Sequence, residues 1–512
     1  MAIDPKHLPD DPKVLQQMIL DLMAQLDREF TERNKIESLL RELLDAKRNR
    51  KSEQLSSDQL ALFAAAWQAR QAATDQKEPA DGPDDDDEAR PTGGEAERRK
   101  RSGGRQSLPK HLSRERIVHD LSDEEKHCKT CQQDLRFIGE ETSERYEYTP
   151  AKLTVIEDVC RKYACGCTVR TATKPAQPIE KSTAGASLLA QVIVSKCADH
   201  LPLHRQEKIF ERHGVHLSRK TMCGWLAQCG DLLKPLYGSL KQVLFQSKVI
   251  GTDDTSVKVL DVKLPFARTG RIWPYYGDKD HPVIVYDYTP TRERAGPEKF
   301  LEGYRGYLQA DAYSGYDAFF KDPGRGMVEV GCWAHARRYY HKALDSDQTR
   351  MGPALLLIAQ LYRVEKQTRL LTGERLQLRQ LQSRPILDKL RNYLLEIETE
   401  VLPKSPEGRA VRYTLKNWTA LTRYCEDGQL EIDNNATERA IRGVAIGRNN
   451  WMFFGSDYGG STAAVLRSFV ASCQRIGIDP FTWFKDILSR IASHPFTRLA
   501  ELLPHNWASA RP

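Results

Sequence analysis

The stretch VLFQSKVIGTDDTSVKVL, residues 243–260, decides the fold of the middle of this 512-residue chain. Apolar and β-branched residues lie on both sides of the acidic pair Asp253 and Asp254, which predicts a β-hairpin. Two further strand candidates, RIWPYYGD (271–278) and VIVYDYTP (283–290), are rich in β-branched and aromatic residues. GYLQADAYSGYD (306–317) and MVEVGCWAHARRYYHKAL (327–344) each predict a short strand that leads into a helix. Antiparallel strands followed by strand–helix units predict a mixed α/β sheet flanked by helices.

Two carboxylates lie where strands of this sheet are predicted to end, Asp253 after the first strand and Asp311 after the fourth. Carboxylates in such positions can hold two hard cations roughly 3.5–4 Å apart, the arrangement that serves phosphodiester chemistry. A third acid is required, and Glu438 in LEIDNNATERAIRGVAIGRNNW (430–451) is the best candidate. Each acid also has a purely structural interpretation, because Asp often ends a strand in a turn and Glu438 has capping-box spacing from Asn435. Spacing alone does not choose between these interpretations.

The chain advances 127 residues from Asp311 to Glu438, too many for one strand–helix step. Residues 345–428 are helical in pattern and predict an insertion in the core, which serves as scaffold or contacts DNA or a second subunit. Arginines are dense beside the acids and suit bidentate phosphate contact; a salt-bridged surface helix is the alternative. These candidate DNA contacts are Arg337, Arg338, Arg439, Arg442 and Arg448. His335 is either a residue that positions the scissile strand or a packed histidine, and with Cys332 it indicates a second metal only weakly.

Five of the eleven cysteines lie between residues 128 and 167. In a chain without an export signal, such a cluster predicts a metal site rather than disulfides. Cys128 and Cys131 form one knuckle, and Cys165 and Cys167 form a second after strand-like sequence at 153–159, as in a zinc ribbon. Because the second pair is closely spaced, Cys160 or His127 is an alternative ligand; reduced cysteines in a metal-free domain are the other interpretation.

Residues 183–245 are helical in pattern, and LPLHRQEKIFERHGVHLSRKTMCGWL (201–226) resembles a helix-turn-helix. The first helix is expected to end near Arg212, with Gly214 in the turn and Ser218 capping the second helix. Arg219 and Lys220 at the start of the second helix are the candidate DNA contacts. A helix pair that only packs is the alternative.

The N-terminal region predicts a coiled coil, since apolar residues recur at alternating steps of three and four over residues 12–50. They are Leu15, Ile19, Leu22, Leu26, Ile36, Leu40 and Leu43, interrupted by Glu29 and Arg33. An amphipathic helix on the chain's own core is the alternative.

Residues 71–107 carry an acidic block (84–88) before a basic block (98–101), which predicts a solvated linker or one that touches phosphates.

Composition excludes some classes of protein. The 77 basic against 70 acidic residues give a net charge of +7, which permits nucleic-acid binding without requiring it. With 40% hydrophobic residues the chain can bury cores, and no apolar run approaches the roughly 20 residues of a membrane-spanning helix. The N-terminus has no signal-peptide pattern, so we expect no membrane partner and a cytoplasmic protein.

Four motifs in this order resemble the transposases of the insertion-sequence-66 family: IGTDDTSV (250–257), GYLQADAYSGYD, GCWAHARRYY (331–340) and EIDNNATERAIRGVAIGRNNWMFFGS (431–456). The segments LSSDQLALF (55–63), LPLHRQ (201–206) and HPFTRLAELLPHNW (494–507) also match. The resemblance implies a ribonuclease-H-like core with an Asp-Asp-Glu triad, which falls on Asp253, Asp311 and Glu438. The chain departs from the family at Asp254, where Glu is usual, and in the narrow Cys165–Cys167 spacing.

The expected organisation is multidomain. A coiled-coil helix (1–60), a charged linker (61–110), a zinc-ribbon-like module (111–180) and a helix-turn-helix-like domain (181–245) precede the core. The ribonuclease-H-like α/β core occupies 246–344 and 429–465, divided by the helical insertion 345–428, and a helical tail spans 466–512.

The resemblance implies a DNA transposase of a bacterial insertion sequence that cleaves element ends and joins the 3′-hydroxyl to target DNA. It implies two Mg²⁺ or Mn²⁺ ions, structural Zn²⁺, double-stranded DNA, a homo-oligomer, small companion proteins of the same element and a location at the nucleoid. The alternatives are a non-catalytic DNA-binding regulator and a nuclease that cuts without joining.

Overall fold

In a computed structural model of the chain, the residues described are Gln59, Phe63, Ala64, Trp67, 153–156, 162–164, 169–171, 176–180, 182–368 and 373–509. The chain divides into two compact units, Met1–Glu78 with Pro175–Pro512, and Pro79–Lys174. The predicted coiled coil, the charged blocks of the linker and the cysteines Cys128, Cys131, Cys165 and Cys167 lie outside the described residues. Within the described residues, no helix has the length and apolar character needed to cross a membrane.

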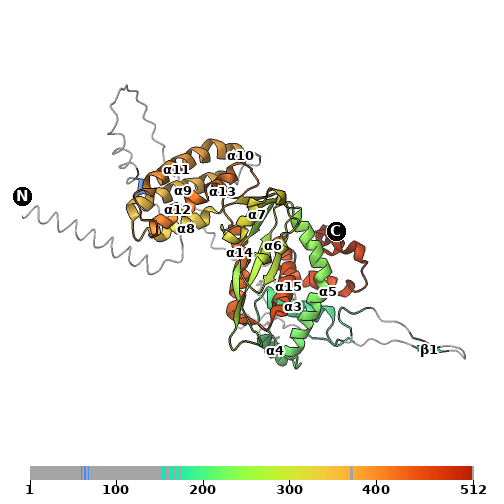
Figure 1. The fold of residues 1–512 in the computed structure, drawn as a ribbon. Coiled ribbons are helices and arrows are strands. Elements are labelled where there is room, and N and C mark those ends of the chain that lie inside the picture. Colours follow the sequence, from blue (N-terminus) through green and yellow to red (C-terminus); the bar gives the residue numbers. More distant parts are fainter. Residues whose placement is uncertain are drawn as a thin grey trace, which may run out of the picture. The chain divides into compact units, whose positions relative to one another are not determined.

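The larger unit contains a mixed seven-stranded sheet (Figure 1). Its strands are β3 Val249–Thr252, β4 Thr255–Val259, β5 Arg268–Tyr276, β6 Ile284–Thr289, β7 Gly306–Gln309, β8 Met327–Val330 and β9 Phe453–Phe454. Strand β5 pairs antiparallel with β6 on one side and with both β3 and β4 on the other. Strand β7 runs parallel to β3, and β8 runs parallel to β7. The predicted mixed sheet is therefore confirmed, whereas the predicted β3–β4 hairpin is wrong because the two strands share one side of β5.

Helices cover both faces of this sheet. On one face, α14 Asn435–Trp451 and α15 Asp457–Arg475 enclose an apolar cluster that includes Val257, Ile272 and Val444. On the other face are α6 Ala295–Phe300 and α7 Asp317–Lys321, and Phe300 stacks on Tyr275 of β5 at 3.8 Å between ring centroids. Successive side chains of β5 point to opposite faces of the sheet, so Ile272 faces α14 and α15 whereas Trp273 faces α6 and α7.

The outer edge of β6 is closed by helix α15. The backbone N–H groups of Ile284 and Tyr286 donate to Ser472 Oγ and Ser468 Oγ, at 3.0 and 2.8 Å. Two serines four residues apart thus satisfy donors that an edge strand would expose to another chain. The predicted boundary between core and tail, after residue 465, falls within α15.

The helices before the sheet are α3 Ala186–Cys197, α4 Leu203–Arg212 and α5 Arg219–Phe245. The predicted turn between α4 and α5 is confirmed: Gly214 has a φ of 75°, and Ser218 Oγ accepts from Thr221 N. Helix α5 is 27 residues long and buries Trp225 together with a row of leucines against the rest of the unit. Helices α16 Pro480–Arg490 and α17 Pro504–Ser509 follow α15 in the chain.

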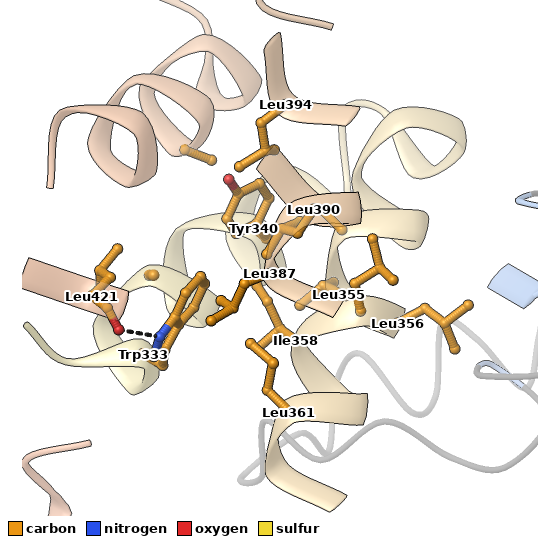
Figure 2. Packing of buried hydrophobic residues seen from close by; sticks show 14 of the residues in the cluster. Trp333, Tyr340, Leu355, Leu356, Ile358, Leu361, Leu387, Leu390, Leu394 and Leu421 are labelled. Atoms are coloured by element: carbon orange, nitrogen blue, oxygen red, sulfur yellow. Dashed lines mark hydrogen bonds between the residues drawn. The ribbon is translucent and has the colours of Figure 1, made fainter. Parts of the chain in front are cut away.

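Between β8 and α14 lies a helical layer made of α8 Trp333–Ala343, α9 Gln348–Thr368, α10 Arg375–Leu378, α11 Arg384–Glu398, α12 Pro406–Lys416 and α13 Trp418–Thr422. Figure 2 shows its apolar interior, where Trp333 Nε1 donates to the carbonyl of Leu421 at 2.8 Å. Tyr340, Leu390 and Leu394 are fully buried in the same cluster. Phe63 and Trp67, which the sequence placed in a charged linker, are helical here and pack against this layer. Their large apolar side chains explain the difference, because burial stabilises them.

A buried arginine ties the helical layer to the segment that precedes α14. Arg379, in the π-helical turn Arg379–Ser383, is fully buried and donates to both carboxylate oxygens of Glu365, at 2.7 and 2.8 Å. It also donates to the carbonyls of Tyr424, Asp427 and Leu430. A buried charge is tolerated only with such complete pairing, so this ion pair fixes the chain's return to the core.

In the smaller unit, β1 Lys162–Ala164 and β2 Val169–Thr171 pair antiparallel. Of the strand predicted at 153–159, residues 153–156 are described and form no strand.

Candidate active site

Asp253 and Asp311 lie at the same edge of the sheet. In the parallel pair β3–β7, Gly251 is opposite Gln309, and each aspartate lies two residues further along its strand direction. The two carboxylates therefore emerge side by side where the strands end. Burial raises the pKa of Asp253 from 3.8 to about 7, and the negative charge of Asp311 is the next cause. The two acids thus repel each other in a partly desolvated position.

Glu438 reaches this edge from the first turn of α14. Asn434, which precedes the helix, donates its side-chain N–H to the carbonyl of Thr252 at 2.8 Å. Gly251 leaves room for this contact, because a Cβ at this position would collide with Thr437 Oγ1 and Asn434 Oδ1. The charge of Glu438 also contributes to the raised pKa of Asp253. The structure thus brings the three predicted acids together, although 185 residues separate the first from the last.

The carboxylate of Glu438 faces helix α8. Its Oε1 lies 3.6 Å from His335 Nδ1, and its Oε2 lies 3.5 Å from Arg338. Oε1 is buried and accepts no hydrogen bond from the residues that the structure describes. Helix α14 has Asn434 as its N-cap, and the side chain of Asn434 makes no capping hydrogen bond. Glu438 is therefore directed at neighbouring groups of the site rather than at its own helix.

Asp254 has surroundings unlike those of Asp253. Its side chain is only 3% exposed and is held by Arg271 at 2.8 Å and Arg292 at 2.7 Å. Strand alternation explains the contrast, because adjacent residues point to opposite faces of the sheet and Asp254 shares the face of Arg271. Two arginines neutralise Asp254, whereas Asp253 faces acids.

The predicted DNA contacts fall into separate groups. Arg439 and Arg442 are exposed on α14, beside Glu438. Arg448 is partly buried on the same helix and donates to Thr255 Oγ1 and the carbonyl of Ser256, at 2.9 and 2.7 Å, so it fastens α14 to β4.

The remaining candidates lie on two other helices. On α8, Arg338 pairs with Glu438, and Arg337 lies over the ring of Tyr362 at 5.5 Å. Arg219 and Lys220 are exposed at the start of α5, where the backbone N–H of Arg219 donates to Glu207 Oε1. These two residues lie on the α4–α5 helix pair and make none of the contacts described for the acidic cluster.

Arg292 is a site residue that the sequence did not predict. It binds Asp254, its pKa is raised in part by the charges of Asp254 and Asp311, and its guanidinium lies over the Tyr313 ring at 4.3 Å. Tyr413 from the helical layer also reaches the site and donates its hydroxyl to the carbonyl of Asp311 at 3.3 Å. Neither residue belongs to a spaced motif, so only the folded chain reveals them.

The donor set of the site suits hard divalent cations. Three carboxylates supply the oxygen ligands that Mg²⁺ and Mn²⁺ prefer. Their mutual repulsion, expressed in the raised pKa of Asp253, is what a bound dication would relieve. The exposed arginines on α14 add positive charge beside the acids, as a phosphate-bearing substrate requires.

Family models match most of the chain. The model described as "Transposase IS66 family" matches residues 181–462, and the "IS66 C-terminal element" matches 468–505. The "zinc-finger binding domain of transposase IS66" matches 125–167, which spans the predicted cysteine ligands and supports a structural zinc ion. The model "Transposase C of IS166 homeodomain" matches 37–117. The chain is thus multidomain, with N-terminal helical and zinc-finger domains before a mixed α/β core.

Similar proteins, described as uncharacterized, come from Sinorhizobium fredii (strain NBRC 101917 / NGR234). The protein y4jD is 31% identical over 535 residues, covering 99% of this chain and 98% of its own length. The protein y4hP is 33% identical, covering 79% of this chain and 77% of its own length. The family models support a transposase role. The matched core, which contains all three converging acids, and the near full-length relative lead to one conclusion: the chain belongs to the IS66 family of transposases.

Proposed function

We propose that this protein is the catalytic transposase of an insertion sequence, with Asp253, Asp311 and Glu438 as the ligands of two Mg²⁺ or Mn²⁺ ions. The observation that carries the proposal is the convergence of these acids at one edge of the sheet, where the charges of Asp311 and Glu438 both help to raise the pKa of Asp253. Asp254 is not part of the ligand set, because Arg271 and Arg292 occupy its carboxylate.

The strand order supports a ribonuclease-H-like core. A meander of β3, β5 and β6 is extended by β7 and β8, both parallel to β3, with the acids at the ends of β3 and β7. Metal ions held at such an edge would activate the attacking oxygen and stabilise the leaving oxygen of a phosphodiester. The first reaction hydrolyses the bond at the element end and frees a 3′-hydroxyl. That hydroxyl then forms a bond to a target phosphorus while the target's own 3′-oxygen leaves.

The chain's own residues hold and orient the DNA. Arg439 and Arg442, exposed beside Glu438, and Arg292 beside Asp311 bind phosphates near the scissile bond. Arg219 and Lys220 bind the element end at the helix-turn-helix, together with the module held by zinc at Cys128, Cys131, Cys165 and Cys167. Joining two ends requires paired protomers, which the N-terminal coiled coil provides. We place the reaction at the bacterial nucleoid, with companion proteins of the same element.

The test compares Asp311→Asn with Asp388→Asn, an exposed aspartate on α11. With pre-cleaved element ends and Mg²⁺, Asp311→Asn should bind ends as the wild type does but insert none into a second duplex. Asp388→Asn should insert ends normally. Undiminished insertion by Asp311→Asn would contradict the catalytic assignment of Asp311. End binding by the wild type without cleavage or insertion would favour a DNA-binding regulator. If the wild type cleaves intact ends but does not insert pre-cleaved ends, the result would favour a nuclease.

A further inference from the structure

A second group of potential metal ligands shares Glu438 with the acidic cluster. The ligand atoms of Cys332, His335 and Glu438 all lie within 4.8 Å of one another. Cys332 precedes α8 and His335 lies in its first turn, so both project toward the start of α14. The fold fixes this arrangement, because Cys332 Sγ accepts from the backbone N–H of Asn434 at 3.2 Å.

The chemistry of these donors differs from that of the three acids. A thiolate, an imidazole and a carboxylate together suit Zn²⁺, whereas Mg²⁺ takes oxygen ligands and disfavours sulfur. Tetrahedral zinc, with bonds of about 2.0–2.3 Å, holds neighbouring ligand atoms about 3.3–3.8 Å apart. His335 Nδ1 and Glu438 Oε1 already meet that spacing at 3.6 Å. The pairs that involve Cys332 Sγ lie no more than 4.8 Å apart and need a spacing of about 3.6 Å, so they have to approach by at most about 1.2 Å, within the reach of side-chain rotation.

The surroundings also favour a cation between these residues. Glu438 Oε1 is buried and accepts no hydrogen bond from any described residue, while Oε2 is directed at Arg338. On binding, the thiol of Cys332 would release its proton to solvent, so that a thiolate and a carboxylate balance the dication. A fourth position is left for water, as in open zinc sites.

We propose that Cys332, His335 and Glu438 form a zinc site, and that Zn²⁺ bound there withdraws Glu438 from the Mg²⁺ ligand set and inhibits the enzyme. The inhibitory part rests on the proposed function, and the binding part does not. The site makes transposition sensitive to the availability of free zinc, through a ligand common to both metals.

Metal stoichiometry tests the binding part on the full chain. The protein is dialysed against buffers of defined free Zn²⁺, and bound zinc is measured by mass spectrometry of the metal. The wild type should hold one zinc ion more than Cys332→Ser or His335→Ala. The control is Cys473→Ser, which alters a fully buried cysteine of α15 outside this group and should hold as much zinc as the wild type. Equal zinc in the wild type and His335→Ala, with both folded by circular dichroism, would overturn the site.

Strand transfer in Mg²⁺ tests the inhibitory part. As Zn²⁺ rises, the wild-type rate should fall in proportion to the additional zinc bound, while His335→Ala, relative to its own zinc-free rate, should stay constant over that range. If the wild type binds the additional zinc ion but strand transfer is not inhibited, the proposal that zinc withdraws Glu438 from the Mg²⁺ ligand set would be overturned. A wild type inactive even without zinc would contradict the proposed function, and the metal count would still decide whether the zinc site exists.

Discussion

Replacing Asp253 with Asn should stabilise the chain when Mg²⁺ is absent, although it removes a proposed catalytic ligand. Burial and the charge of Asp311 raise the pKa of Asp253 from 3.8 to about 7. Between these pH values the folded chain keeps a proton on Asp253 that the unfolded chain has lost. Folding stability therefore falls as pH rises through this window, and the full penalty is present above pH 7.

The size of the effect follows from the same two values. The difference between 3.8 and about 7 corresponds to about 4 kcal/mol of unfolding free energy at pH 8, and at pH 5 the penalty is below about 2 kcal/mol. Asn cannot ionise and resembles the protonated acid, and its side-chain oxygen can still accept the N–H of Asp254 that Asp253 accepts at 2.6 Å. The advantage of Asp253→Asn over the wild type should thus grow by about 2–3 kcal/mol from pH 5 to pH 8.

Urea unfolding followed by tryptophan fluorescence measures this difference in Mg²⁺-free buffer. All eight tryptophans lie in the larger unit, so the signal is independent of unfolding in the zinc-finger unit. Saturating Mg²⁺ should reduce the advantage of the variant, since it stabilises the wild type more strongly. The control is Asp388→Asn, which removes an exposed charge and should show no comparable dependence on pH. A constant difference between Asp253→Asn and the wild type from pH 5 to pH 8 would refute the reasoning.

Three further predictions concern the supports of the site and its DNA contacts. Arg379→Met leaves the buried Glu365 paired only with Arg375, so it should lower the free energy of unfolding by about 3 kcal/mol. Its control, Arg350→Met, breaks half-exposed ion pairs and should lower that free energy by about 1 kcal/mol or less in the same urea assay. Gly251→Ala forces a methyl group against Asn434 and Thr437 at the start of α14, so it should abolish strand transfer while the far-ultraviolet circular dichroism stays native. Normal strand transfer by this variant would show that the close contact between β3 and α14 is unimportant. Arg439→Gln with Arg442→Gln should weaken DNA binding at all sequences and lower the slope of log affinity against log salt by about 2, which titrations at several salt concentrations measure; an unchanged slope would remove α14 from the DNA surface.

Local signals predicted much of the fold. The α4–α5 turn was predictable because Gly214 and Ser218 act on their immediate neighbours, whatever the rest of the chain does. Strand β9 was not, since Phe453–Phe454 is too short for a periodic pattern and becomes a strand only by pairing with β4. The contact between α15 and β6 was not predictable for a similar reason: Ser468 and Ser472 gain a structural role only against β6.

The candidate site was likewise predictable only in part from the sequence. The sequence placed Asp253 and Asp311 at strand ends, and β3 and β7 do end just before them. It did not separate Asp254 from Asp253, because the arginines that neutralise Asp254 come from β5 and from the segment after β6. It also did not reveal that Arg448, one of the candidate DNA contacts, binds β4. The partners of Asp254 and Arg448 are distant in the sequence and are brought to them only by the folded sheet.

Helix α14 is held at both ends by the sheet, by Asn434 on β3 and by Arg448 on β4. The chain regains the sheet just before α14, where the side chain of Gln309 donates to the carbonyl of Glu431. The helical layer also reaches the site, since His335 and Arg338 of α8 lie beside Glu438 and Tyr413 of α12 donates to the carbonyl of Asp311. In mechanical terms the acids share one frame with this layer: a displacement of α8 or α12 would change the surroundings of Glu438 or Asp311.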